Sequence, residues 1–561
     1  MPSTAAPAPP RVRLLLARFS HTGLVFAALF YIIANTPSLL PRPWWMQGLV
    51  AALSGVCGYV LGLALGRLAH ATARWLGLHV TMNPRRRVLL GRIGIAFAAL
   101  IVISFPQATI DWQREVSRQV DVDGPGWWYP TGSTLVAVVV FVLFILVWRG
   151  LAGLTRFFLT KVSSRIVREA AARLVASVIT VATVVVAIDV VVEPAVLAVV
   201  GGNADRVNKQ MPRGEHAPTS SLRSGGPGSP LTWNSLGQDG AKFVAAGPDA
   251  KQIADVTKTP AKEPVRVFVG ANQSLEKSAD LAVAELDRTD AWKRKAMLVI
   301  TPTSTGYVNL WGAASFEYLL GGDTAAVGMA YSNLPSAFGL LTAPRDPGKA
   351  SQILLEKVRR RVDAMPAAQR PKVYFTGESL GAYGADDSFD SPQQMLERTD
   401  GGVLSGTPAF SPNRQRLTRE RAPGSTTIDP VVNGGRHIRF AGEPSQLGAD
   451  EYDRPLGAWQ KPRVVYLQHP SDPVVWWSPR LMFNSPEWLR ETRDNTPMAQ
   501  MSWAPFFTFW QVSADMLVSN EVPGGYGHRY FGAEMVPAWA KVLDVDPGSR
   551  EDAIIDAVGR R

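Results

Sequence analysis

The sequence predicts a multi-span α-helical membrane module followed by an α/β domain, whose mostly parallel sheet carries helices on both faces. Three observations indicate this organisation. Residues 1–200 contain long apolar runs, residues 201–264 are polar and rich in glycine and proline, and residues 265–561 alternate short apolar strands with amphipathic helices. Alternation of strand and helix favours a parallel sheet, and 561 residues suffice for about three domains.

The composition excludes several classes of function. A net charge of +11 would suggest a nucleic-acid-binding protein if a soluble domain carried it. However, residues 1–200 contain 18 basic and 7 acidic side chains, whereas residues 201–561 contain 40 of each. The excess therefore belongs to the apolar half, so we expect membrane topology and no nucleic-acid partner. The single cysteine, Cys57, excludes an intramolecular disulfide and cysteine-based metal sites.

Five apolar runs in residues 1–200 approach the length that a transmembrane helix requires, which is about 20 residues for a bilayer core of about 30 Å. The runs are Thr22–Leu40, Met46–Leu65, Val88–Phe105, Ser133–Trp148 and Leu174–Val192. Two alternatives stay open. Some runs could be buried helices of a soluble core, and the first could be a cleaved signal peptide. The number of runs within so short a stretch favours a membrane module.

The basic residues predict the orientation of this module. Of its 18 Lys and Arg residues, 15 precede the first run or lie around the connections between runs two and three and between runs four and five. The positive-inside rule then puts the N-terminus in the cytoplasm. Five spans would put everything after about residue 200 outside, unless the apolar stretch Glu193–Val200 completes a sixth span.

Six short apolar runs in residues 265–561 are predicted strands of one sheet. They are Val265–Val269, Ala296–Thr301, Ala325–Tyr331, Lys372–Thr376, Gly402–Gly406 and Val464–Gln468. Helical patterns follow the first three runs, near Ser274–Asp287, Val308–Leu320 and Lys349–Met365. Residues 411–460 lack a clear pattern, and we expect an insertion or lid there. We expect residues 201–264 to form a linker.

The segment Gly377-Glu378-Ser379-Leu380-Gly381 matches G-x-S-x-G, the pattern of a nucleophile elbow. In an elbow the serine lies on a strained turn between a strand and a helix, and the glycines permit close backbone approach. The predicted strand Lys372–Thr376 directly precedes the motif, and a helical pattern begins at Leu380. Ser379 is therefore the candidate nucleophile.

A serine nucleophile needs a base that takes its proton and an acid that orients the base, here in the chain order Ser, Asp or Glu, His. Three histidines follow Ser379, namely His437, His469 and His528. We favour His528, because it lies in a glycine-rich, loop-like context near the end of the domain.

We favour Asp472 as the acid. It follows the predicted strand Val464–Gln468, and an acid at the carboxyl end of a parallel strand faces the crevice where such sites lie. The alternative acids lie close to the elbow or in the irregular segment: Asp386, Asp387, Glu451 and Asp453.

Acyl transfer by a serine also requires N–H donors for an oxyanion. One expected donor is the backbone N–H of Leu380, and a second should come from the loop after the strand Ala296–Thr301. The candidates in that loop are Thr303, Ser304 and Thr305. An ordinary polar turn is the alternative interpretation of this loop.

The chain resembles a bacterial membrane-bound alpha/beta-hydrolase family with a multi-span N-terminal region. The resemblance covers nearly the whole chain and depends on a combination of features. These are the five apolar runs, Ser224–Ser229 with Trp233, Thr303–Gly306, the elbow Gly377–Gly381 and Ser471–Pro473. It implies a serine hydrolase fold with an extracytoplasmic catalytic domain, and it implies no particular substrate.

Together these features predict an integral protein of a bacterial plasma membrane that acts as an esterase- or lipase-like serine hydrolase. Ser379, His528 and Asp472 would form a catalytic triad without a metal or organic cofactor. The expected partners are the lipid bilayer and a small-molecule or lipid acyl substrate of the membrane or cell envelope. An acyltransferase with the same acyl-enzyme, a peptidase or a thioesterase, and a non-catalytic scaffold or transport protein are the alternatives.

Overall fold

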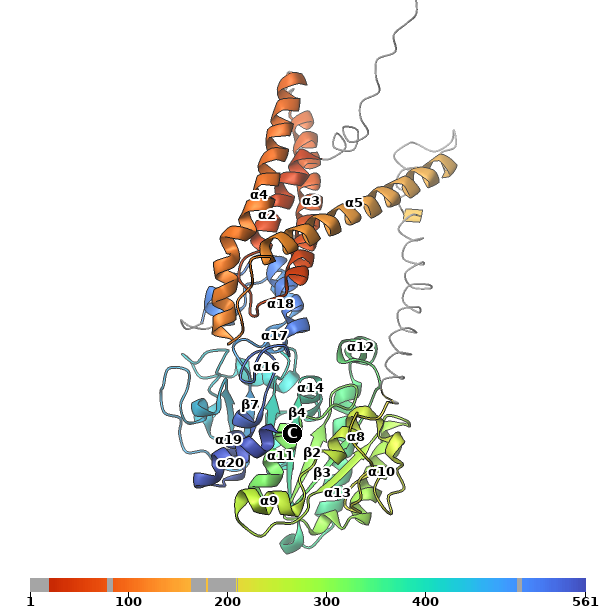
Figure 1. Ribbon diagram of the computed structural model, residues 1–561, viewed down its shortest axis with the longest axis vertical. Helices are drawn as coiled ribbons and strands as arrows, with labels where there is room; N and C mark the ends of the chain where they lie inside the picture. Colours follow the sequence, from red (N-terminus) through yellow and green to blue (C-terminus); the bar gives the residue numbers. More distant parts are fainter. Residues whose placement is uncertain are drawn as a thin grey trace, which may run out of the picture. The chain divides into compact units, whose positions relative to one another are not determined.

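The computed structural model describes residues 20–77, 84–162, 178–179, 208, 210–491 and 497–560. The chain forms two compact units, and the first includes a segment from the C-terminal half of the sequence (Figure 1). The first unit comprises Met1–Val186, Pro479–Leu489 and Asp494–Val518, and the second comprises Ala187–Ser478, Arg490–Arg493 and Ser519–Arg561.

In the described part of the first unit, four long or apolar helices dominate: α2 (His21–Ala34), α3 (Trp44–Trp75), α4 (Pro84–Gln119) and α5 (Tyr129–Val162). Its C-terminal segment adds η7 (Pro479–Met482), η8 (Glu487–Leu489), η9 (Pro497–Gln500) and α18 (Phe507–Val518). Among the described residues, three stretches are long and apolar enough to cross a membrane, namely Trp44–Trp75, Gly91–Gln119 and Tyr129–Thr155. They correspond to the second, third and fourth predicted spans.

The first predicted span is shorter in the structure than predicted, and the fifth lies almost entirely outside the described residues. Helix α2 has only 14 residues, fewer than a straight transmembrane helix needs. It stops at Ala34 because Pro37 follows closely, and proline disfavours helical backbone in the residue before it. The fifth span, Leu174–Val192, lies outside the described residues apart from positions 178–179.

Glycines allow α2 and α3 to approach closely. A Cβ on Gly62 of α3 would lie 2.5 Å from the carbonyl oxygen of Thr22 on α2, and Gly58 meets Phe26 in the same way. Spacing of small residues by four is typical of packed membrane helices. In contrast, large apolar side chains such as Leu68, Phe97 and Leu143 are more than half exposed. An outward apolar surface of this kind suits a lipid environment.

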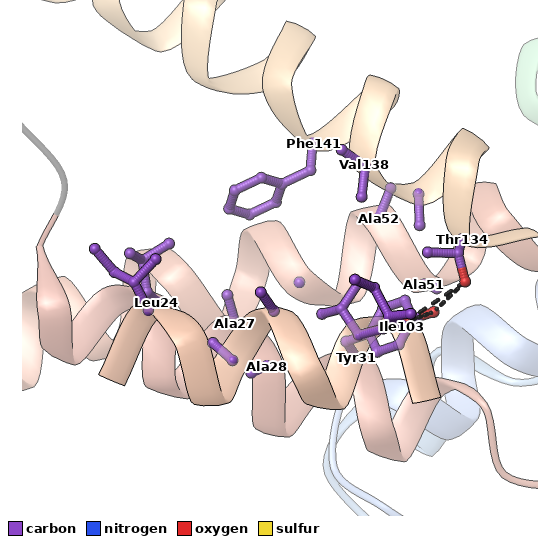
Figure 2. Close-up of a pocket in the computed structure, with 16 residues that line it drawn as sticks. Leu24, Ala27, Ala28, Tyr31, Ala51, Ala52, Ile103, Thr134, Val138 and Phe141 are labelled. Atoms are coloured by element: carbon purple, nitrogen blue, oxygen red, sulfur yellow. Dashed lines mark hydrogen bonds between the residues drawn. The ribbon is translucent and has the colours of Figure 1, made fainter. Parts of the chain in front are cut away.

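Helices α2–α5 also line an apolar pocket of about 300 Å³ (Figure 2). Many of the lining side chains are alanines, including Ala27, Ala28, Ala51 and Ala52. One polar pair lies in its wall. The Tyr31 hydroxyl donates to the carbonyl oxygen of Val102 at 3.1 Å and lies 3.1 Å from the Thr134 hydroxyl. These bonds satisfy the polar atoms in an otherwise apolar setting.

The second unit contains a seven-stranded sheet in the order β1-β3-β2-β4-β5-β7-β6, and every strand pair is parallel. The strands are β1 (Val265–Val269), β2 (Ala296–Thr301), β3 (Thr324–Met329), β4 (Lys372–Glu378), β5 (Gly401–Ser405), β6 (Ile438–Ala441) and β7 (Arg463–Leu467). Most strands are buried along their whole length, as continuous apolar runs in a parallel sheet require. All six predicted strands are present within two residues of the predicted bounds.

Helices cover both faces of this sheet (Figure 1). One face carries α10 (Leu275–Arg288), α13 (Asp346–Asp363), α14 (Leu380–Asp387), α15 (Pro392–Arg398) and α16 (Pro412–Arg419). The other carries α8 (Gly237–Ala245), α11 (Leu310–Leu319) and α19 (Gly532–Leu543). Helices α9 (Ala250–Thr257) and α20 (Glu551–Gly559) pack on α11 and α19, and α12 (Ser336–Thr342) and α17 (Pro473–Trp476) follow β3 and β7.

Two segments differ from the expectations. The described part of the predicted linker 201–264 is largely folded, since Phe243 of α8 and Ile253 of α9 are fully buried. Its glycine- and proline-rich turn also pairs with the edge strand β1, where Ser224 N–H donates to the carbonyl oxygen of Arg266. Residues 411–460 are not simply an insertion or lid, because they supply α16 and the edge strand β6.

Candidate active site

Ser379 lies on the turn between β4 and α14 and has the backbone angles φ 58° and ψ −126°. A positive φ is uncommon for a residue with a side chain and costs on the order of 1–3 kcal/mol. The neighbouring strand holds this conformation, because Ser379 N–H donates to the carbonyl oxygen of Ser405 at 3.0 Å. The turn has the strained strand-to-helix geometry of a nucleophile elbow.

Both flanking positions of the elbow require glycine. A Cβ on Gly377 would lie 2.5 Å from the backbone of Gly381, and a Cβ on Gly381 would overlap the carbonyl oxygen of Thr301. Backbone atoms cannot move aside as a flexible side chain can. The two glycines therefore permit α14 to begin directly against the ends of β4 and β2.

Asp472 follows β7 and is fully buried. Its Oδ1 accepts the N–H of Val474 at 2.8 Å, which caps the short helix α17. Its Oδ2 accepts two bonds, from His528 Nδ1 at 2.7 Å and from the Tyr530 hydroxyl at 2.8 Å. The carboxylate is thus fixed from both sides and can hold the imidazole in one orientation.

His528 lies in the loop between α18 and α19 and is 5% exposed. Its backbone N–H donates to the carbonyl oxygen of Ser519 at 2.8 Å. Burial lowers the pKa of His528, but the adjacent Asp472 carboxylate outweighs burial and the net pKa is raised. The other ring nitrogen, Nε2, has no hydrogen-bond partner within the described residues. It is therefore the nitrogen on which a proton can be received.

Ser379 and His528 each contact the carboxyl end of β5 or the residue that follows it. The carbonyl of Ser405 binds the Ser379 N–H, and the next residue, Gly406, lies so close to the imidazole that a Cβ there would overlap it. Gly406 also has a φ of 58°, which glycine adopts without strain. No hydrogen bond joins Ser379 Oγ to His528 Nε2 among the described residues. Such bonds are often long without substrate.

The predicted oxyanion donors are Leu380, which follows Ser379, and a loop whose first residue, Pro302, lies close to Gly381. Leu380 is the first residue of α14, where backbone N–H groups have no acceptor within the helix. The N–H of Thr303 donates to the carbonyl oxygen of Tyr307 at 2.9 Å, so that amide is already engaged. The backbone N–H groups of Ser304 and Thr305 remain as the candidates from this loop. The Thr305 hydroxyl donates to Asp239 at 2.7 Å, which anchors the loop.

Two features of the site were not foreseen from the sequence. Glu378, predicted only as a residue of the nucleophile elbow, accepts bonds from the Asn309 side-chain amide and, at 3.4 Å, from the Ser405 hydroxyl. Burial raises the pKa of Glu378 to about 7, and His528 is the largest opposing influence. The sequence signal that could have identified Glu378 was its position as a charged residue directly after a buried strand. Tyr530, which binds Asp472, gave no comparable signal.

The rival histidines make structural contacts. His469 donates from Nδ1 to the carbonyl oxygen of Gly527 at 2.9 Å and pairs through Nε2 with Glu534. Its pKa is raised, because Glu534 outweighs the opposing effect of burial. His437 Nδ1 lies 3.1 Å from the backbone carbonyl oxygens of Gln460 and Pro462.

Among the alternative acids, Asp386 is fully buried and accepts bonds from Asn413 N–H, Arg414 N–H and the Tyr466 hydroxyl. Asp387 lies at the end of α14 against Gly348. Glu451 accepts the hydroxyl of Thr426, and Asp453 occupies a turn with a positive φ. In the part of the chain that the structure describes, no group of three or more His, Cys, Asp or Glu residues could hold a metal ion.

A parallel sheet with a serine elbow after β4, an acid after β7 and a histidine in a later loop defines the alpha/beta-hydrolase class of folds. A model of the alpha/beta-hydrolase family matches residues 265–554, and a model of the N-terminal region of an alpha/beta-hydrolase family matches residues 36–248. The chain belongs to the alpha/beta-hydrolase family. Neither a curated protein nor a solved structure matches it.

Proposed function

We propose that the protein is a membrane-anchored serine hydrolase that cleaves an ester or related acyl substrate through an acyl-enzyme. The single observation that carries the proposal is the buried Asp472–His528 pair, with a bond of 2.7 Å, beside a serine on a strained turn. A histidine on the solvated surface would not require a buried carboxylate such as Asp472 as its hydrogen-bond partner. Strained turns and buried ion pairs of this kind gather at functional sites.

In the proposed reaction, Ser379 Oγ attacks the substrate carbonyl carbon while His528 Nε2 takes the hydroxyl proton. Asp472 stabilises the imidazolium that forms and keeps Nδ1 protonated. The backbone N–H of Leu380 and that of Ser304 or Thr305 bind the oxyanion. The tetrahedral intermediate collapses, the leaving alcohol takes the proton from His528, and the acyl group stays on Ser379. Water then enters by the same steps and releases the acid.

The proposed setting is a bacterial plasma membrane, with the N-terminus in the cytoplasm and the catalytic domain outside. The three long apolar helices support an anchor in a membrane, and the basic residues around the five apolar runs of the sequence support the orientation. A site tethered at a membrane favours lipid or cell-envelope esters as substrates. The proposed partners are accordingly the bilayer and an acyl substrate of this class.

A membrane-impermeant fluorophosphonate probe applied to intact cells tests the proposal. We expect the wild type and Ser221→Ala, which alters an exposed serine, to become labelled, and Ser379→Ala to stay unlabelled. Labelling that appears only after lysis would place the catalytic domain inside and contradict the orientation. A folded wild-type protein that never becomes labelled would contradict the proposed hydrolase mechanism.

A further inference from the structure

An asparagine at the start of α11 bonds to two segments that carry the candidate triad. Asn309 is the N-cap of this helix, because its Oδ1 accepts the N–H of Gly312 at 2.8 Å. Asparagine is a favoured residue at this position. The cap engages only the oxygen of the side-chain amide, so both N–H donors of the same group are left for other partners.

The two donors of this amide bond to the candidate site. Asn309 Nδ2 donates to the Glu378 carboxylate and, at 3.1 Å, to the carbonyl oxygen of Tyr530. These partners lie 69 and 221 residues away in the sequence. Capping explains the bond to Gly312 and leaves the other two bonds unexplained. A role beyond starting the helix is therefore needed for the nitrogen side of the amide.

The first bond reaches the residue directly before the candidate nucleophile. Glu378 ends β4, and the oxygen that accepts from Asn309 also accepts the Ser405 hydroxyl at 3.4 Å. The carbonyl oxygen of Ser405 in turn accepts the Ser379 N–H at 3.0 Å. Asn309 is thus bonded into the same set of contacts that holds the strained elbow.

The second bond reaches the loop of the candidate base. Tyr530 follows His528 by two residues and is fully buried. Its hydroxyl donates to Asp472 Oδ2 at 2.8 Å, and its ring lies edge-on to the imidazole of His528, with centroids 5.9 Å apart. Asn309 therefore holds the main chain of a residue whose side chain contacts both the acid and the base.

Asn309 also ends the loop that should supply an oxyanion donor. This loop folds back on itself, because the N–H of Thr303 donates to the carbonyl oxygen of Tyr307 and the N–H of Gly306 to that of Thr303, both at 2.9 Å. Tyr307 is only two residues before Asn309. A shift of Asn309 away from Glu378 would consequently move this loop relative to Ser379.

We propose that Asn309 is a positioning residue for the hydrolase reaction, whose side-chain amide sets the loop of His528 and the oxyanion loop relative to Ser379. The inference rests on the proposed function, because it concerns the geometry of the same site. Every contact that carries it lies within the second unit. Asn309 acts through Glu378 and Tyr530, so its loss should slow the reaction more than it weakens substrate binding.

The test compares Asn309→Ser with the wild type, both as full-length protein in lipid nanodiscs. Serine caps a helix about as well as asparagine, so this change keeps the cap and removes both Nδ2 bonds. With a short p-nitrophenyl ester we expect kcat to fall about 10- to 100-fold, because displacements near 1 Å cost rates of this order. KM should stay within about twofold of the wild type. A smaller fall of kcat in the folded variant would overturn the inference.

Asn413→Ser is the matched control. Asn413 is buried in the same unit, and its Nδ2 also donates two bonds, to the carbonyl oxygens of Asp386 and Phe389, each at 2.7 Å. We expect this control to lower the unfolding temperature and to leave kcat near the wild-type value. Equal losses of kcat in Asn413→Ser and Asn309→Ser would overturn the inference, because they would show a general effect of lost buried bonds.

A rescue experiment separates positioning from capping, and it decides if Asn309→Ser does not fold. Asn309→Asp keeps an oxygen for the N–H of Gly312 but sets a second carboxylate against Glu378. At about pH 9 both carboxylates are ionised, because the pKa of Glu378 is about 7. Adding Glu378→Gln exchanges donor and acceptor, since the new amide can donate to the new carboxylate. We expect the double variant to have a kcat at least about tenfold above that of Asn309→Asp, as a hydrogen bond to a charged group would give.

A double variant no more active than Asn309→Asp would overturn the inference. The proposed function fails separately, when the wild type itself does not react with a fluorophosphonate at Ser379. A wild type that reacts, together with an Asn309→Ser protein of undiminished kcat, would leave the proposed function standing and remove only the role of Asn309.

Discussion

Replacing Asp472 with asparagine separates a catalytic carboxylate from a merely structural one. In the wild type, Oδ2 accepts from both His528 and Tyr530, while Oδ1 accepts from Val474 N–H. If the asparagine keeps its oxygen toward Val474, its NH₂ group faces His528 Nδ1, which must then accept. The ring proton moves to Nε2, and His528 can no longer receive the proton of Ser379.

The magnitude follows from counting buried groups. In the reverse orientation the amide NH₂ would face the N–H of Val474, and both donors would lack an acceptor. In the first orientation only the hydroxyl hydrogen of Tyr530 lacks an acceptor. The difference, one buried polar group, favours the inactive tautomer by about 1–3 kcal/mol. Loss of the charge-assisted bond to the imidazolium costs a further 1.5–3 kcal/mol or so in the transition state. Together these effects predict a fall in kcat/KM of about 10²- to 10⁴-fold.

The assay is the second-order rate constant for fluorophosphonate labelling, together with kcat/KM for a short ester. Asp386→Asn is the matched control, because Asp386 is equally buried and also accepts a tyrosine hydroxyl and backbone N–H groups. We expect this control to lose about 1–3 kcal/mol of stability and to react at nearly the wild-type rate. An Asp472→Asn protein that retains more than a tenth of the wild-type rate constant would refute the reasoning.

Three further predictions concern neighbouring groups. Glu378→Gln should shift the acid limb of the pH–rate profile to lower pH, because the ionised fraction of the Glu378 carboxylate raises the pKa of His528; an unmoved limb would exclude this coupling. Gly381→Ala should abolish fluorophosphonate labelling and lower stability by about 1–3 kcal/mol through overpacking, whereas Gly559→Ala, in open space, should do neither. The raised pKa of His469 adds stability that is fully present below about pH 6.5 and is lost as pH rises through the higher folded-state pKa. Chemical denaturation between about pH 5 and about pH 9 should therefore show that the free energy of unfolding falls less with pH in His469→Gln than in the wild type. An identical fall in the two proteins would contradict the assignment.

The sheet could be predicted from the sequence because its strands are short, continuous apolar runs buried on both faces. The edge strand β6 was the exception. Its sequence Ile-Arg-Phe-Ala carries a buried arginine, and Arg439 is tolerated there only because it donates to three backbone carbonyls, those of Gly435, Leu447 and Gly457. Those carbonyls come from loops that no local pattern identifies.

The order of Ser379, Asp472 and His528 could be inferred from the motif and the strand ends. The division of the chain into its two units could not be inferred from the sequence. Helix α18 is apolar enough for a soluble core, and its partners in the helical unit, such as Arg42 for Asp515, lie more than 400 residues away in sequence. The first predicted span was too long for a similar reason, because an apolar average across Asn35 and Pro37 conceals the helix end.

The most direct test of the account locates the reactive nucleophile in the purified, folded protein. Fluorophosphonate-treated protein would be digested and the adduct assigned by tandem mass spectrometry. The account predicts a single adduct on Ser379, formed much more slowly in Asp472→Asn and absent in Ser379→Ala. An adduct on another residue, or a folded protein that stays unmodified, would contradict the claim that Ser379 is an activated nucleophile.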